Sequence, residues 1–127
     1  MRNLLFVGIG GFAGAILRYL VSGYVQDLSR RVDFPYGTLA VNVTGCFLLG
    51  ALSQMVALQW DIAAEIRLML MVGLLGAFTT YSTFGNETLT LIQDQRLFLA
   101  LMNIGTHLFL GLLAVLLGQL AVTTIWR

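Results

Sequence analysis

Residues 76–85 read Gly-Ala-Phe-Thr-Thr-Tyr-Ser-Thr-Phe-Gly, and they lie within a segment that is otherwise hydrophobic enough to cross a membrane. The stretch carries four threonine and serine hydroxyls, a tyrosine and two flanking glycines. In hydrocarbon, each polar group that lacks a partner costs several kcal/mol, so such a stretch is tolerated where it is buried in protein or lines a polar cavity. We therefore expect an interrupted membrane helix, broken near residues 76–82, with functional groups at the break.

The composition around this stretch indicates an integral membrane protein. The chain has 127 residues, of which 58% are hydrophobic and only 10% are charged, whereas soluble domains carry roughly 25% charged residues. Four membrane spans of about 20 residues use about two thirds of the chain. We therefore expect one all-α membrane domain over residues 1–127. A net charge of +1 argues against nucleic acid as a partner.

Hydropathy predicts four transmembrane helices, at about residues 4–24, 37–58, 64–92 and 97–125. The first resembles a signal peptide, but it contains Arg18 and lacks a small-residue cleavage site, so we interpret it as a retained helix. The third is longer than a straight span needs, which leaves room for the interruption. Gly10 and Gly14 are spaced for close helix packing in the first span.

The arginines do not favour one orientation in the membrane. The side with both termini and the 59–63 connection holds Arg2, Arg67 and Arg127, and the opposite side holds Arg30, Arg31 and Arg96. Because positive residues set orientation, this balance predicts insertion both ways and an antiparallel, dual-topology homodimer. The alternative is that another feature sets a single orientation.

Polar residues at membrane depth form narrow stripes on three of the predicted helices. Thr38 and Asn42 are one helical turn apart, and so are Asn103 and His107. In the third span, Thr80, Phe84 and Glu87 recur at helical spacing, with Thr83 beside them. Intramembrane polar groups are functional candidates by default.

Each candidate also has a purely structural interpretation. Asn42 could join helices, His107 could be a hydrogen-bonded core histidine, and Glu87 could lie near the membrane surface. Arg18 could extend its charge to the interface, and Tyr81 and Phe84 could be ordinary packing residues.

The balance of these groups favours an anion as cargo. Amide, imidazole and hydroxyl groups are donors, and aromatic rings present a positive edge. Neutral donors bind an anion weakly enough to release it. No phosphate-binding loop or nucleophile–base pair is evident, so we expect a passive pore and not an enzyme.

Three motifs give the chain a resemblance to a known family. They are Gly11-x-x-Gly14-Ala15-x-x-Arg18-Tyr19, Gly37-Thr38-Leu39-x-Val41-Asn42-x-x-Gly45 and Gly73-x-x-Gly76-x-x-Thr79-Thr80-Tyr81-Ser82-Thr83-Phe84. In this order, in four spans, they resemble the Fluc (CrcB) fluoride-channel family over essentially the whole chain. The resemblance implies a double-barrelled antiparallel homodimer in a bacterial plasma membrane. Its expected function is passive export of fluoride, which relieves fluoride toxicity.

The resemblance also implies roles for individual residues. A structural sodium ion at the dimer centre would be held by the backbone carbonyls of Gly76 and Thr79. The pore phenylalanines of the family match Tyr81 and Phe84, so Tyr81 is a departure that adds a phenol. The other pore residues implied are Asn42, Ser82, Thr83, Asn103, His107 and Thr38, with Glu87 at the vestibule and Arg18 in span one.

Two other functions remain open from the sequence. A small four-helix proton-coupled multidrug antiporter has the same size, and Glu87 is the only acid that could serve it as a coupling site. A non-transporting assembly subunit is the second alternative. Fluoride flux from proteoliposomes separates all three functions.

Overall fold

The computed structural model describes residues 1–31 and 33–126, and this part of the chain is entirely helical with short connections. Its elements are α1 (Arg2–Ser29), α2 (Tyr36–Ala57), α3 (Ala64–Arg67), the π-helix η1 (Leu68–Leu74), α4 (Leu75–Phe78), α5 (Tyr81–Gln93) and α6 (Leu97–Ile125). Four helical segments are long and apolar enough to span a membrane, the third running over Ala64–Gln93. The predicted all-α fold with four such helices is confirmed.

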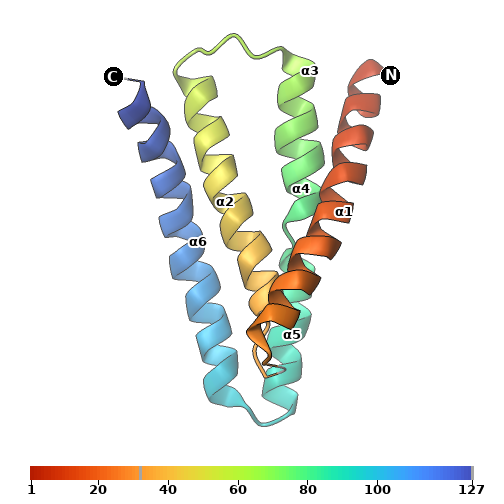
Figure 1. The fold of residues 1–127 in the computed structure, drawn as a ribbon, viewed down its shortest axis with the longest axis vertical. Coiled ribbons are helices and arrows are strands. Elements are labelled where there is room, and N and C mark those ends of the chain that lie inside the picture. The colour runs from red at the N-terminus through yellow and green to blue at the C-terminus, as the bar shows by residue number, and fades with distance from the viewer. Residues whose placement is uncertain (32, 127) are drawn as a thin grey trace.

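Both termini and the connection from α2 to α3 lie at one end of the molecule, while the α1–α2 loop and the α5–α6 turn lie at the other (Figure 1). Helix α2 packs beside α6, and α1 packs against η1 and α4. Arg2 and Arg67 therefore lie toward the end with the termini, and Arg30, Arg31 and Arg96 lie toward the opposite end, as expected from the sequence. Arg127 lies outside the described residues.

Glycines allow these helix pairs to approach closely. A Cβ atom on Gly14 of α1 would lie 2.1 Å from the Leu74 carbonyl oxygen, and one on Gly118 of α6 would lie 2.1 Å from the Phe47 carbonyl oxygen. Neither atom fits, because both contacts are with backbone. Gly10 is equally crowded by Met69, so the close packing predicted at Gly10 and Gly14 is confirmed.

The third span is interrupted at Thr79 and Thr80, within the interval predicted from the hydroxyl-rich stretch. Both residues have extended backbone, with φ/ψ of −85°/157° and −150°/112°. Helix α5 then begins at Tyr81, and the Thr80 side-chain oxygen caps it by accepting a hydrogen bond from the Thr83 amide at 3.2 Å. The break thus ends one helix and begins the next without a loop.

Candidate functional site

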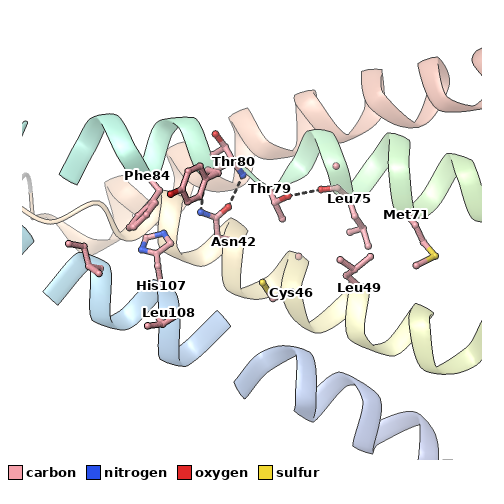
Figure 2. Close-up of a pocket in the computed structure, with 14 residues that line it drawn as sticks. Asn42, Cys46, Leu49, Met71, Leu75, Thr79, Thr80, Phe84, His107 and Leu108 are labelled. Carbon is pink, nitrogen blue, oxygen red and sulfur yellow. Dashed lines mark hydrogen bonds between the residues drawn. The ribbon is translucent and has the colours of Figure 1, made fainter. Parts of the chain in front are cut away.

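A cavity of about 530 Å³ lies beside the break (Figure 2). Helix α2 contributes Asn42 to it, the break contributes Thr80, and α6 contributes His107, with Tyr81 and Phe84 of α5 completing its polar and aromatic side. The rest of the lining is mainly apolar. Among the described residues that line the cavity, none carries a carboxylate, an ammonium or a guanidinium group. The site therefore offers neutral polar groups inside an apolar surround.

The Asn42 side chain takes over the backbone hydrogen bonds that the break removes. Its Oδ1 accepts from the Thr80 amide at 2.7 Å, and its Nδ2 donates to the Thr80 carbonyl at 3.0 Å. Both bonds are visible in Figure 2. A primary amide has two N–H donors, so one remains after this contact. Asn42 therefore fixes the break and retains a donor beside the cavity.

The same contact leaves a carbonyl without its helical partner. In an uninterrupted helix the Thr80 amide would donate to Gly76, four residues earlier, but here it donates to Asn42. The Thr79 amide still bonds the Leu75 carbonyl at 3.0 Å, and the Thr79 hydroxyl adds a second bond of 2.9 Å to that oxygen. Unwound backbone carbonyls of this kind coordinate Na⁺ in membrane proteins. The residues present at the break fit a sodium ion.

Hydroxyl groups cluster at the start of α5. The Thr80 hydroxyl donates to the Thr83 hydroxyl at 2.9 Å and lies 3.4 Å from the Ser82 hydroxyl. Thr80 is buried, whereas Ser82 and Thr83 are exposed on the surface of this chain. The cluster thus connects the buried break to an exposed face at membrane depth.

Three rings continue the site along α5. The Tyr81 and Phe84 centroids are 5.6 Å apart at 50°, and those of Phe84 and His107 are 4.4 Å apart at 41°. Tilted rings of this kind bring the positive edge of one ring toward the face of its neighbour. The Tyr81 side chain is 83% exposed, so it faces away from the core of this chain.

A chain of polar contacts joins α5 to α6 below these rings. Asn103 is fully buried, and its Nδ2 donates to the Thr88 hydroxyl at 2.9 Å, which in turn donates to the Phe84 carbonyl at 2.8 Å. His107 donates from Nδ1 to the Asn103 carbonyl at 3.0 Å. Asn103 Oδ1 and His107 Nε2 are buried without a hydrogen-bond partner among the described residues. Both are acceptors, because the His107 proton is on Nδ1, so a water molecule could donate to either.

Glu87 lies one turn beyond Phe84, at a second cavity of about 380 Å³. Its Oε1 accepts a hydrogen bond of 2.6 Å from the Thr38 hydroxyl of α2, while its Oε2 has no partner within the described residues. Phe84, Glu87 and Leu91 recur at helical spacing, so the same face of α5 lines the first cavity at Phe84 and the second at Glu87 and Leu91.

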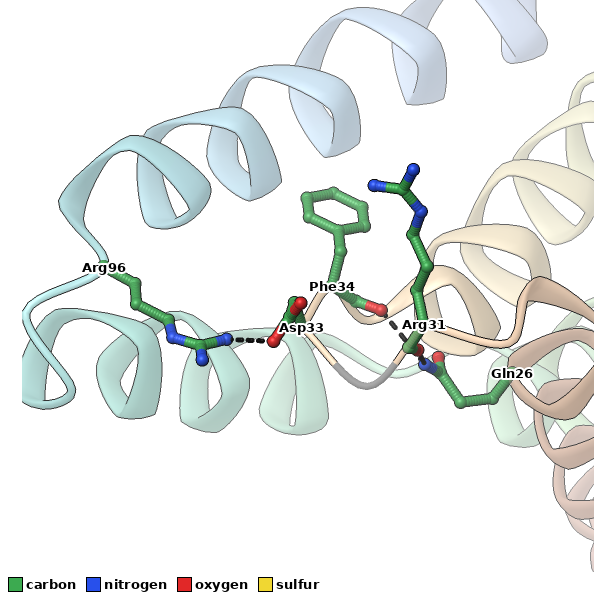
Figure 3. A network of polar contacts seen from close by, with 5 residues as sticks. All are labelled: Gln26, Arg31, Asp33, Phe34 and Arg96. Atoms are coloured by element: carbon green, nitrogen blue, oxygen red, sulfur yellow. Dashed lines mark hydrogen bonds and ion pairs between the residues drawn. The ribbon is translucent and has the colours of Figure 1, made fainter.

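The second cavity is bounded by loops that polar contacts hold in place (Figure 3). Gln26 of α1 donates to the Arg31 and Phe34 carbonyls at 2.6 and 3.1 Å and accepts from the Gly37 amide at 3.1 Å. Asp33 pairs with Arg96, which joins the α1–α2 loop to the α5–α6 turn. This hydrogen bond and the charge of Asp33 raise the pKa of Arg96 above its ordinary value.

Half of the expected pore residues line the two cavities, namely Asn42, Tyr81, Phe84, His107 and Glu87. Thr38, Ser82, Thr83 and Asn103 line neither but belong to the hydrogen-bonded groups beside them. Arg18 stands apart, because it is half-buried on α1 and belongs to neither set. Two participants were not among the residues expected from the sequence, namely Thr88 and Gln26. The position of Thr88, two turns beyond Thr80, is a sequence signal for its role. Gln26 has no such signal, because two of its partners, Arg31 and Phe34, lie in an irregular loop.

Comparison with known proteins agrees with this architecture. Residues 5–119 match the family model described as CrcB-like protein, Camphor Resistance (CrcB). The chain is 44% identical over 121 residues to "Fluoride-specific ion channel FluC 1" of Methanosarcina acetivorans, covering 95% of this chain and 91% of that protein. It is 45% and 46% identical over 119 residues to the "Fluoride-specific ion channel FluC" of Shewanella woodyi and of Shewanella sediminis, with 94% of each chain covered. This chain belongs to the CrcB family of fluoride-specific ion channels.

Proposed function

We propose that this chain is a fluoride-selective passive channel, located as a multi-pass protein in a bacterial plasma membrane, which exports fluoride from the cytoplasm and relieves its toxicity. The observation that carries this proposal is the cavity beside Thr80, whose polar groups are neutral donors and tilted rings enclosed by apolar helices. The names of the close relatives support fluoride as the ion.

Permeation would exchange the water around fluoride for protein donors one step at a time. The second N–H of Asn42 and the hydroxyls of Ser82 and Thr83 supply donors near the break, and Tyr81 and Phe84 supply ring edges. The described residues that line the cavity beside the break include no fixed cation, which would allow the ion to leave as well as enter.

The remaining assignments extend this path toward the second cavity. The unpartnered His107 Nε2 and Asn103 Oδ1 are acceptors, and they would hold water along α6. The second Nδ2 proton of Asn103 would donate to fluoride. Thr38 orients the Glu87 carboxylate at the vestibule through their hydrogen bond. Arg18 remains a candidate through its motif alone.

The working unit would be an antiparallel homodimer. Ser82 and Thr83 carry hydroxyls and Gly76 has an unpaired carbonyl, and all three residues are exposed at membrane depth in the single chain. Lipid cannot satisfy such groups, so a second copy must cover them. In the sequence the expected topology has three arginines on each side, Arg2, Arg67 and Arg127 against Arg30, Arg31 and Arg96, and this balance supports an antiparallel pair.

A sodium ion would be the structural cofactor of this dimer. Gly76 and Thr79 of both subunits would offer their carbonyl oxygens to it, and the unpaired Gly76 carbonyl is the observation that supports this assignment. The ion supplies positive charge, which offsets the repulsion between converging carbonyl dipoles. Its role is to hold the two breaks together.

The proposal is tested by fluoride efflux from proteoliposomes that contain the purified chain, recorded with a fluoride electrode. Fast efflux that does not depend on a proton gradient is expected, and efflux should fall when sodium is omitted throughout preparation. Thr44 is exposed on α2 and lines neither cavity, so Thr44→Ala serves as the control for Phe84→Ala, which should lose flux.

Two results would overturn the proposal in different directions. Proton-coupled uptake of an organic cation without fluoride flux would identify an antiporter. The absence of any flux, with full fluoride resistance retained in cells that carry Asn42→Ala or Phe84→Ala, would identify an assembly subunit.

A further inference from the structure

The mouth of the second cavity carries more negative than positive charge. Asp33, Glu87, Asp94 and Arg96 line it, so three carboxylates face one guanidinium. The cavity lies at the end of the molecule where the α1–α2 loop and the α5–α6 turn meet. An anion that enters or leaves here meets a mouth whose formal charge is unfavourable.

Arg96 is the cation that could attract an anion to this mouth, but Asp33 neutralises it. The two side chains form an ion pair, and they are 47% and 63% exposed, so both remain in contact with water. Gln26 hydrogen-bonds to the Arg31 and Phe34 carbonyls, which lie on either side of Asp33 in the chain. These contacts favour the position of Asp33 opposite Arg96.

An exposed ion pair contributes little to stability. Its effect on the electrostatic potential of a cavity is larger, because clefts lined by charge change the local concentration of ions and their rate of entry. The arrangement is thus better suited to setting the charge at the mouth than to bracing the fold.

We infer that Asp33 masks the charge of Arg96 and that this pair sets the rate at which fluoride enters and leaves the second cavity. The inference rests on the proposed function, since it takes fluoride as the permeating ion. Removal of Asp33 exposes the guanidinium and raises flux, whereas removal of Arg96 leaves three carboxylates and lowers it.

The test compares Asp33→Asn and Arg96→Gln, because each variant breaks the same ion pair but changes the charge in the opposite direction. Fluoride efflux is measured in sodium-containing proteoliposomes at ionic strengths from about 10 mM to about 1 M, set with an impermeant salt. Over this range the screening length falls from about 30 Å to about 3 Å. At low salt Asp33→Asn should raise flux about twofold and Arg96→Gln should lower it by a similar factor, as expected for one charge acting through water over about 10 Å.

Two further variants isolate the cause. Asp27 is exposed at the same end of the chain but does not line the cavity, so Asp27→Asn should change flux less than Asp33→Asn does. The double exchange Asp33→Arg with Arg96→Asp keeps the pair and the net charge, and its flux should equal the parent's. Elution as a single species from size exclusion confirms that each variant is folded.

Opposite shifts that disappear at about 1 M salt support the inference. Shifts in the same direction for both single variants would mean that the pair acts as a mechanical brace, and that result overturns it. Unchanged flux in both variants, or an equal effect of Asp27→Asn, also overturns it. No flux from the parent protein overturns the proposed function, and this inference falls with it.

Discussion

At the residue scale, Asn42 combines two tasks that are usually separate. Its amide pairs with both the N–H and the carbonyl of Thr80, as a neighbouring backbone would. A hydrophobic side chain could do neither, and a carboxylate could only accept. The need to pair both groups of Thr80 explains why an amide lies at this depth in α2. A general role in joining helices explains it less well.

Asn42→Ala should both destabilise the protein and reduce fluoride flux. Thr80 is buried, so its orphaned N–H costs about 1–3 kcal/mol. Asn42→Asp should retain the bond from the Thr80 amide and therefore more of the stability, but its charge should stop fluoride. The thermal unfolding of each variant in detergent and its efflux rate check this, with Thr44→Ala as control. Wild-type unfolding and flux in Asn42→Ala would contradict the assigned role.

Tyr81 offers a second test at a single residue, because its ring edge and its hydroxyl can be separated. The side chain is largely exposed and lies 5.6 Å from Phe84 by ring centroids. If the ring edge is what fluoride meets, Tyr81→Phe should conduct as the parent does. Tyr81→Ala should conduct about tenfold less, which corresponds to about 1.4 kcal/mol, the size of one aromatic contact. Equal losses in both variants would assign the role to the hydroxyl.

At the scale of helices, close approach depends on particular glycines. Gly14 and Gly23 both lie in α1, but a Cβ atom meets the Leu74 carbonyl oxygen at Gly14 and open space at Gly23. Gly14→Ala should therefore lower stability by about 1–3 kcal/mol, the usual cost of overpacking, and Gly23→Ala should not. Thermal unfolding in detergent compares the two. Equal unfolding temperatures would mean that α1 can shift without cost.

The helices also differ in how far the sequence could predict them. Hydropathy located the four apolar segments, and the hydroxyls of Thr79 and Thr80 located the break. Helix α1 extends to Ser29, beyond the predicted end at residue 24. Its polar last turn is stabilised because the Gln26 side chain hydrogen-bonds to the Arg31 carbonyl and the Gly37 amide. The π-helix η1 had no signal, since its leucine-rich sequence fits an α-helix equally well.

The contacts within the candidate site were less accessible to sequence reasoning than the elements. Asn42 and Thr80 are 38 residues apart, and periodicity assigns a residue to a face of its own helix without naming its partner on another. The same limit applied to the ion pair of Asp33 and Arg96, which joins two loops that hydropathy marks only as polar.

At the scale of the whole molecule, the single chain leaves polar groups exposed at a depth where lipid would surround them. Ser82 and Thr83 present hydroxyls there, and Gly76 presents an unpaired carbonyl. Each four-helix chain has arginines at both ends. A second copy in the opposite orientation would cover the polar face and remove its polar groups from lipid. The arginines at both ends of each chain would allow both orientations.

An antiparallel dimer predicts the behaviour of two variants that are each confined to one orientation in the membrane. Each should be inactive alone, and the two should be active when they are expressed together. Asn3→Arg with Ala63→Arg adds charge at the end with the termini, and Leu28→Arg with Gln93→Arg adds charge at the opposite end. By the positive-inside rule each pair should fix one orientation, so neither alone can form an antiparallel dimer. Fluoride resistance in cells that lack their own exporter should be lost for each alone and restored when both are expressed. Full resistance from either variant alone, with labelling of added cysteines confirming a single orientation, would exclude the antiparallel dimer, because every subunit would then function beside a parallel partner or by itself.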